Sequence, residues 1–337
     1  MKLCKKIIAA VVMAAMLAAC IPGFAALEPE YPEVPEGYDG YVTFAVSALT
    51  MGWTYIIDPL LVPIHEGETF DTVTIRAFEM LDWSYDASVS EYGFSLNGIG
   101  CYETEPMVPE YLMNEILAYP AWAEENFGYS FGEWTGSYVD DEILSTYEYC
   151  TLSGWMYSEN NVVPDVGADG CVVTAGNVYT WFFTIYGWGM DYGVSDGWGS
   201  FPTFDNPMEG VDRTRASEVL ALICADDDLI DYAVEYALPE LADLLDLFYW
   251  PETSQEELDA ALETFLEAMD SEPGDLQMGD VNMDGSVTIE DALITLRYAL
   301  ELIDLDENAL AVADMNLDGH VDCVDALIVL RTALGII

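Results

Sequence analysis

The pattern of hydrophobic and polar positions first predicts a strand-rich region. Runs of β-branched and aromatic residues at 41–49 (YVTFAVSAL) and 178–187 (VYTWFFTIYG) have the length and composition of strands, and 154–164 (GWMYSENNVVP) is typical of a strand entering an Asn-containing turn. Between them, residues 67–81 predict a short helix crossing one face of the sheet. Its expected apolar contacts are Phe70, Val73, Ile75, Phe78 and Leu81.

A second pattern, with helical periodicity, follows from residue 213 to 270. Residues 216–250 are rich in Ala and Leu and are interrupted at Pro239. Residues 254–270 begin with Ser254 three positions before Glu257, which is a capping-box signature, and they carry an apolar stripe. This segment is therefore expected to form a small helical hairpin or bundle, followed by a linker at 271–278.

Two similar stretches of twelve residues, DVNMDGSVTIED (280–291) and DMNLDGHVDCVD (314–325), repeat one oxygen-rich pattern 34 residues apart. Each has Asp at positions 1, 5 and 12, Asn at 3 and Gly at 6. Calcium prefers about 6 to 8 oxygen ligands, which a tight loop supplies at alternating positions. The expected metal-binding residues are Asp280, Asn282, Asp284, Ser286, Thr288, Asp291, Asp314, Asn316, Asp318, His320, Asp322 and Asp325. Ser286 and His320 are expected to contribute backbone carbonyls only, with a solvent-facing His320 side chain.

Each loop is followed by nearly the same apolar sequence, DALITLRYAL (291–300) and DALIVLRTAL (325–334), which predicts a helix. The leucines Leu293, Leu296, Leu300, Leu327, Leu330 and Leu334 are expected to face inward. One loop and one helix cannot bury such a stripe alone. Two copies are expected to bury it against each other, with a calcium ion fixing each loop.

With these motifs, residues 279–337 resemble a type I dockerin, the module that attaches secreted cellulosomal proteins to cohesin domains of a scaffoldin. The resemblance implies loop-and-helix units similar to half EF-hands, two Ca²⁺ ions and a cohesin partner. Loop positions 10 and 11 depart from the family, which has a Ser-Thr-like pair there. The expected partner-binding residues are Ile289, Glu290, Arg297, Cys323, Val324 and Arg331.

Charge and the N-terminus indicate an extracellular protein. Three lysines precede an apolar run ending near Ile21, followed by the small residues Gly23, Ala25 and Ala26, so residues 1–25 are expected to be a signal peptide. A rival interpretation is a lipobox, in which Cys20 is lipidated. Cleavage after Ala25 removes three lysines and no acid, which changes the formal charge from −54 to −57. Such a surface repels nucleic acid and anionic lipid. Residues 26–40, Pro-rich and acidic, are expected to form an extended linker.

A second resemblance covers the strand-rich part of residues 41–212. Ser153, Gly154, Trp155, Met156 and Tyr157, with the Asn turn and Pro164, resemble the signature of a family of unknown function related to the C-terminal domain of transcobalamin. Asp165 and residues 175–177 depart from it, and residues 107–144 look inserted. The resemblance implies a β-grasp-like fold of strands around one helix. The whole chain is then an α+β multidomain protein.

Two further features of this region carry expectations. Trp188, Tyr192 and Trp198 are interleaved with glycines, so they are candidates for a platform that stacks on a glycan or peptide ligand; a glycine-rich loop folded over the sheet edge is the alternative. Cys150 and Cys171 flank one strand and its turn, and a secreted protein favours their oxidation to a disulfide. Cys224, in a helical stripe, is expected to be a buried thiol.

The residue inventory favours a noncatalytic binding protein over an enzyme. With only two histidines, His65 and His320, the chain lacks the spacing of a serine triad or of a zinc hydrolase. Among 62 acidic residues, no carboxylate pair singles itself out for glycoside hydrolysis. The alternative is a glycoside hydrolase that carries a dockerin. Corrinoid binding is a less favoured alternative, because it rests only on a fold-level analogy to transcobalamin.

Overall fold

The computed structural model describes residues 30–91, 93–101, 105–138, 142–186, 189–192, 211–270, 278–283, 286–300, 302–305, 307–316 and 319–336. The chain divides into a large unit that ends at Ala268 and a C-terminal unit that begins at Met269. The expected signal peptide and Cys20 lie outside the described residues, as do Trp188, Trp198, Asp284 and Asp318.

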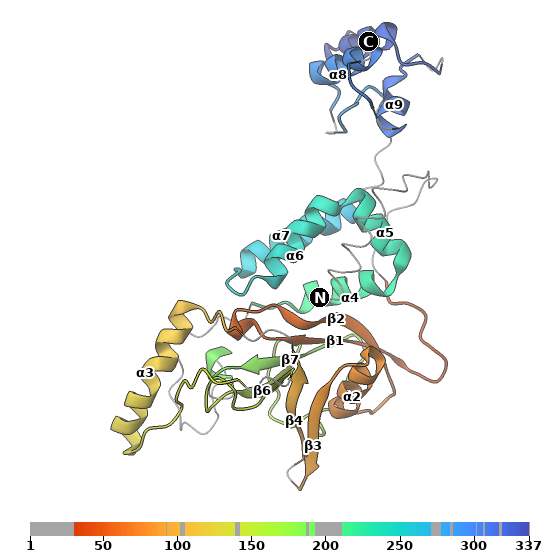
Figure 1. Ribbon diagram of the computed structural model, residues 1–337. Helices are drawn as coiled ribbons and strands as arrows, with labels where there is room; N and C mark the ends of the chain where they lie inside the picture. The colour runs from red at the N-terminus through yellow and green to blue at the C-terminus, as the bar shows by residue number, and fades with distance from the viewer. Residues whose placement is uncertain are drawn as a thin grey trace. The chain divides into compact units, whose positions relative to one another are not determined.

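A four-stranded mixed sheet forms the centre of the large unit, and its order is β2-β1-β7-β6 (Figure 1). Strand β1 (Gly40–Ser47) pairs antiparallel with β2 (Tyr55–Ile64) and parallel with β7 (Val178–Thr184), which pairs antiparallel with β6 (Gly154–Glu159). The three strands predicted from the sequence are confirmed. The turn after β6 contains Asn160 and Asn161, both with positive φ, as a tight hairpin requires.

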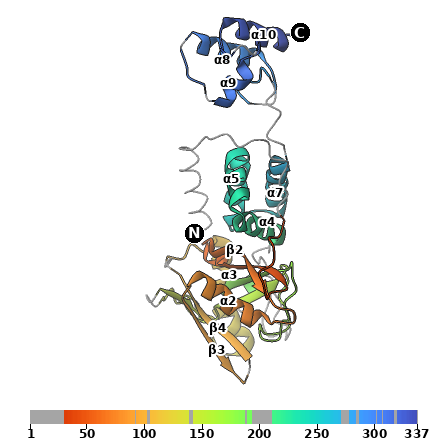
Figure 2. The ribbon, with the colours of Figure 1, turned by 90° about the vertical axis from the view of Figure 1, so that its right-hand side faces the viewer.

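Helix α2 (Phe70–Leu81) packs against one face of this sheet, as predicted (Figures 1 and 2). Phe70, Val73 and Phe78 are buried, and the ring of Phe70 lies within 5.5 Å of the rings of Tyr157, Tyr179 and Trp181. The indole Nε1 of Trp181 donates a 2.9 Å hydrogen bond to the hydroxyl of Thr74. Burial of these aromatic side chains stabilises the helix on the sheet.

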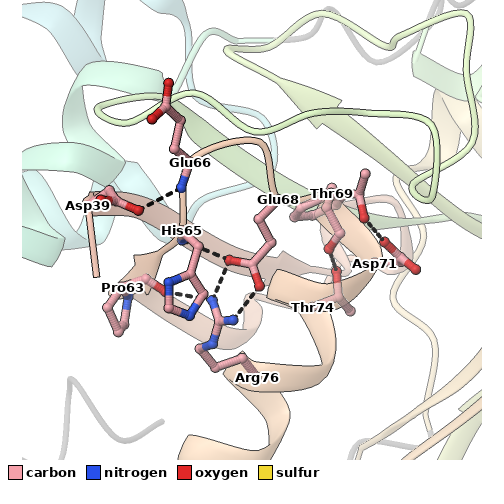
Figure 3. A network of polar contacts seen from close by, with 10 residues as sticks. Asp39, Pro63, His65, Glu66, Glu68, Thr69, Asp71, Thr74 and Arg76 are labelled. Carbon is pink, nitrogen blue, oxygen red and sulfur yellow. Dashed lines mark hydrogen bonds and ion pairs between the residues drawn. The ribbon is translucent and has the colours of Figure 1, made fainter. Parts of the chain in front are cut away.

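The loop between β2 and α2 is held by a network around Arg76 (Figure 3). The guanidinium group forms an ion pair with Glu68 and donates a 2.7 Å hydrogen bond to the carbonyl of Pro63. The same guanidinium lies over the ring of Tyr38, which stacks on His65 at 4.6 Å. One of the five arginines of this acidic chain therefore fixes the connection from strand to helix.

Residues 85–145 form a part that the hydrophobic pattern did not define. A three-stranded antiparallel sheet has the order β3-β4-β5, with β3 (Tyr85–Ser90), β4 (Gly93–Gly100) and β5 (Ile143–Ser145). Helix α3 (Glu110–Phe127) lies within the stretch that looked inserted. Elsewhere in the large unit, the described residues also include the 3-10 helices η1 (Leu49–Met51) and η2 (Met190–Tyr192).

Four helices follow: α4 (Thr214–Ala225), α5 (Asp227–Tyr236), α6 (Leu238–Tyr249) and α7 (Gln255–Asp270). Pro239 lies in the first turn of α6, where it is tolerated because its missing N–H has no helical partner anyway. Both Ser254 and Glu257 make the capping contacts predicted for α7. Helix α4 packs on β2 through Ala221, Leu222 and Leu61. These helices and the sheet thus form one compact unit.

The C-terminal unit contains α8 (Ile289–Ala299), α9 (Glu307–Ala313) and α10 (Cys323–Ala333). Its core consists of Val281, Ala309, Val312 and Ala313, with Ile294, Leu305 and Val321 packed around them. The expectation that the repeated leucines face inward is wrong, since Leu293, Leu300, Leu327 and Leu334 are 45–55% exposed. The buried residues of α8 and α10 are instead small or polar: Ala292, Thr295, Ala326 and Val329 among them, and these permit close helix contact.

The cysteines also differ from expectation. Cys150 and Cys171 are both buried free thiols rather than a disulfide. The Sγ of Cys150 lies 3.9 Å from the carbonyl of Gly132. The carbonyl of Cys171 accepts a hydrogen bond from the N–H of Phe70 at the start of α2, so the two cysteines contact different segments. Cys224 is half-buried. No helix in the described residues is long and apolar enough to cross a membrane.

Candidate functional site

The first oxygen-rich loop is organised by the carboxylate of Asp291 at position 12. Its Oδ1 accepts hydrogen bonds from the N–H groups of Val281 and Asn282, at 2.9 and 3.0 Å, and its Oδ2 accepts from the N–H and the hydroxyl of Thr288. The Asp291 side chain is fully buried. Burial opposes its ionisation, but these hydrogen bonds outweigh burial and hold the pKa of Asp291 below its usual value. One carboxylate thus ties the start of the loop to its end.

The second loop repeats the arrangement around Asp325. Its Oδ1 accepts from the N–H of Asn316 at 3.2 Å, its Oδ2 accepts from the N–H of Asp322 at 2.9 Å, and the side chain is fully buried. At position 1, Asp314 accepts a 2.8 Å hydrogen bond from the N–H of Gly319 at position 6. Gly319 has φ +84°, so glycine suits this turn.

Position 9 of each loop has a role that the sequence interpretation missed. Thr288 is the N-cap of α8 and accepts from the N–H of Glu290, while Asp322 is the N-cap of α10 and accepts from the N–H of Val324 at 2.6 Å. Asp291 and Asp325 complete two capping boxes. The signal was present in the sequence, because T-x-x-D and D-x-x-D precede apolar runs. The loops therefore end by starting the helices.

The donor set of the two loops fits a hard divalent cation. All its side-chain donors are oxygens apart from the ring of His320, which is exposed as expected, and Asp280, Asp291 and Asp325 are buried. A buried carboxylate requires a cation or strong hydrogen bonds to remain ionised. Within the described ranges no three acidic, His or Cys residues gather as a metal site, and the position 5 acids Asp284 and Asp318 fall outside those ranges.

A comparison with protein families matches residues 278–332 to the dockerin type I domain. The C-terminal unit carries a type I dockerin domain. Type I dockerins bind calcium, and a dockerin implies attachment to a cohesin domain of a scaffoldin. Proteins that carry one are typically secreted into the cellulosome. A search of curated proteins finds none that matches the chain.

The dockerin presents an apolar groove between α8 and α10, here termed the leucine groove, with a volume of about 330 Å³. Its lining comes in equivalent pairs from the two repeats: Ile289 and Cys323, Ala292 and Ala326, Leu293 and Leu327, and Leu296 and Leu330. Ile289 is 60% exposed and Leu327 is 54% exposed. A contiguous exposed apolar surface of this kind is typical of a protein-binding site.

The predicted partner-binding residues lie at or beside this groove. Ile289 and Cys323 line it at the first turn of each helix, and Glu290, Val324, Arg297 and Arg331 are all exposed. Arg297 and Arg331 lie in the last turns of α8 and α10, where a positive charge also interacts favourably with the helix dipole. The structure therefore leaves all six side chains accessible.

Of the predicted ligand platform, only Tyr192 lies in the described residues. Its ring packs on Phe182 of β7 at 4.5 Å, and it lines a cavity on that face of the sheet. Tyr192 is anchored by its neighbour Asp191, whose buried carboxylate accepts hydrogen bonds from Thr184, Ile185 and Tyr186. The platform remains a prediction for Trp188 and Trp198.

Proposed function

We propose that this protein is a secreted, noncatalytic component of a cellulosome, attached through its dockerin and presenting a ligand-binding β-rich domain. The observation that supports the anchoring role most directly is the leucine groove, because it repeats the same four positions from both loop-and-helix units and leaves Ile289, Leu293 and Leu327 exposed. We assign cohesin contact to this groove and to the charged residues at its margins.

The dockerin is proposed to hold two calcium ions, one in each loop. In the first, the ligands would be the oxygens of Asp280, Asn282, Asp284 and Asp291 with the carbonyl of Ser286, and Thr288 directly or through water. In the second, they would be Asp314, Asn316, Asp318, Asp322 and Asp325 with the carbonyl of His320. Calcium would supply positive charge to carboxylates that the fold already buries. Because Asp291 and Asp325 also complete the capping boxes of α8 and α10, metal binding is expected to fix both helices.

The domain that the dockerin carries is proposed to be β-grasp-like and related to the C-terminal domain of transcobalamin. Its parallel central pair β1 and β7, the antiparallel strands β2 and β6 on either side, and the single helix α2 across one face support this assignment. Fold alone does not supply a ligand, so no corrinoid-binding residues are carried over.

The anchoring proposal is tested by calcium-dependent capture on a panel of cohesins. Wild-type protein should bind cohesin in calcium and should no longer bind in excess chelator. The double variant Asp280→Ala/Asp314→Ala should also fail to bind cohesin, while its tryptophan fluorescence stays native. All nine tryptophans lie between Trp53 and Trp250, so that signal reports on the large unit alone. Glu263→Gln, on the exposed side of α7, is a matched charge control. Capture that survives chelation would contradict the mechanism, and sugar release from plant polysaccharides would replace the noncatalytic role with an enzyme.

A further inference from the structure

The face of the central sheet opposite α2 contains a cavity of about 250 Å³. Because Trp181 points toward α2, the alternate residues Thr180 and Phe182 of β7 point to the other face, where they line this cavity. Ser158 and Asn161 line it from β6 and its turn, as do residues of α4. The volume is just below the range of pockets for drug-sized ligands, so it suits a molecule of one ring.

Arg213 is the cationic residue of the lining, and it is 91% buried. Its Nε donates to the carbonyl of Phe248 at 3.1 Å and its Nη2 donates to the carbonyl of Trp250 at 2.9 Å, so half of the guanidinium caps the end of α6. In the part of the chain that the structure describes, Nη1 has no hydrogen-bond acceptor and no carboxylate forms an ion pair with Arg213.

Two phenol rings lie near this guanidinium. Burial raises the pKa of both Tyr55 and Tyr192, and the positive charge of Arg213 opposes the rise in each. Both tyrosines also line the cavity, together with Phe182. The cavity thus combines aromatic faces, neutral hydroxyl and amide groups, and one buried cation whose Nη1 has no acceptor among the described residues.

We infer that this cavity binds a small sugar acid of monosaccharide size, with Nη1 of Arg213 pairing its carboxylate. A ligand carboxylate would pair with the buried guanidinium, because a charge-assisted hydrogen bond to a buried group is strong. Hydroxyls of the sugar match Ser158, Thr180 and Asn161, and its apolar face matches the aromatic rings. This assignment names the ligand class for the ligand-binding role proposed above and rests on that role.

Binding is measured by calorimetry on the full-length protein in calcium, with D-galacturonate as the probe and D-galactose as its neutral counterpart. Galacturonate should bind saturably and galactose at least about tenfold more weakly. Arg213→Gln should weaken galacturonate binding by about tenfold or more, while Arg215→Gln, an exposed arginine two residues away, should change it by less than about twofold.

Arg213→Gln also removes contacts to α6, so Thr180→Val serves as a second variant that leaves that cap intact. It should weaken galacturonate binding by about fivefold with native tryptophan fluorescence. Equal binding of galactose and galacturonate, no saturable binding of galacturonate, or unchanged affinity in both variants would each overturn the assignment. Cohesin capture by the same samples reports on the anchor separately, so failure of the cavity and failure of the anchor are distinguishable.

Discussion

The hydroxyl of Thr184 lies 2.6 Å from Oδ1 of Asp191, and this contact holds η2 against the end of β7. Oδ2 of the same carboxylate accepts from the N–H of Ile185 at 2.7 Å and from that of Tyr186 at 3.3 Å. Full burial nevertheless raises the pKa of Asp191 to about 7, since the hydrogen bonds only partly oppose desolvation. This group therefore links the stability of the large unit to pH.

Asp191→Asn should remove a pH-dependent cost to folding. Because the pKa is about 7 in the folded state and about 3.9 unfolded, the folded state binds more protons between these values. The stabilising effect of the protonated group is full below about pH 4 and is lost as the pH rises to about 7. The free energy of unfolding, measured by urea unfolding with tryptophan fluorescence, should decline less steeply between about pH 4 and 7 in the variant than in wild type. The difference in slope should be at most about 1.4 kcal/mol per pH unit. The exposed acid Asp231, changed to Asn, should leave the decline unaltered.

Tyr249→Phe should weaken the attachment of α6 to the sheet. The phenol of Tyr249 donates a 2.8 Å hydrogen bond to Oδ1 of Asp58 on β2, and Asp58 is 9% exposed. Removing a donor to a buried carboxylate costs about 1–3 kcal/mol. Tyr147→Phe, at a side chain that is 61% exposed, is the matched control and should leave the free energy of unfolding nearly unchanged. Equal unfolding free energies for the two variants would contradict a stabilising role for the Tyr249 contact.

Glu68→Gln should destabilise the large unit at neutral pH by about 1–3 kcal/mol, because it leaves the guanidinium of Arg76 without its ion pair (Figure 3). Burial favours the protonated acid, but the bonds from Arg76 and from the N–H of His65 hold the pKa of Glu68 below its usual value. Its contribution is therefore present above about pH 4.3 and is lost as the pH falls through the lower folded pKa. Glu79→Gln, exposed on α2, is the control, and a difference that persists in acid would count against the ion pair.

Asp substitution in the leucine groove should separate the contributions of the two repeats. Leu293→Asp and Leu327→Asp alter equivalent exposed positions, so both variants should fold in calcium. Positions 10 and 11 differ between the repeats, so we expect one substitution to reduce cohesin capture about tenfold or more and the other to reduce it little. Leu302→Asp, 68% exposed outside the groove lining, should have no effect. Equal losses in both groove variants would indicate equivalent use of the two repeats.

The thiols should differ sharply in reactivity toward an alkylating reagent. Cys323 is exposed, whereas Cys150 is fully buried, and burial raises the pKa of Cys150 to about 11. Mass mapping of native protein should find Cys323 labelled and Cys150 and Cys171 labelled only after unfolding. A peptide that joins Cys150 to Cys171 without reduction would restore the disulfide predicted from the sequence.

The sequence predicted best where one local pattern decides structure. Strands β1, β6 and β7, helix α2 and the cap at Ser254 follow from periodicity and turn chemistry within a few residues. The pairing of β1 with β7 joins segments more than 130 positions apart, and no local pattern encodes it. Likewise, nothing near Arg213 in the sequence indicates that its guanidinium reaches the end of α6.

In the dockerin, the loops were predictable but the direction of the leucines was not. Periodicity identifies an apolar stripe without stating what covers it, and α8 carries two apolar sides. Ala292 and Thr295 are buried positions of α8, whereas Leu293 and Leu296 remain exposed along the groove between α8 and α10. An exposed apolar stripe is therefore a signal of a binding partner rather than of a core.

Strand β2 forms one edge of the central sheet and contains Pro59 and Pro63. Proline has no N–H group, so it is tolerated at an edge and gives an incoming strand fewer donors to pair with. A scaffoldin that gathers dockerin-bearing proteins would raise their local concentration far above that of free protein. Under such crowding, an edge that resists pairing keeps neighbouring copies from joining sheet to sheet, so close assembly on one scaffold need not lead to aggregation.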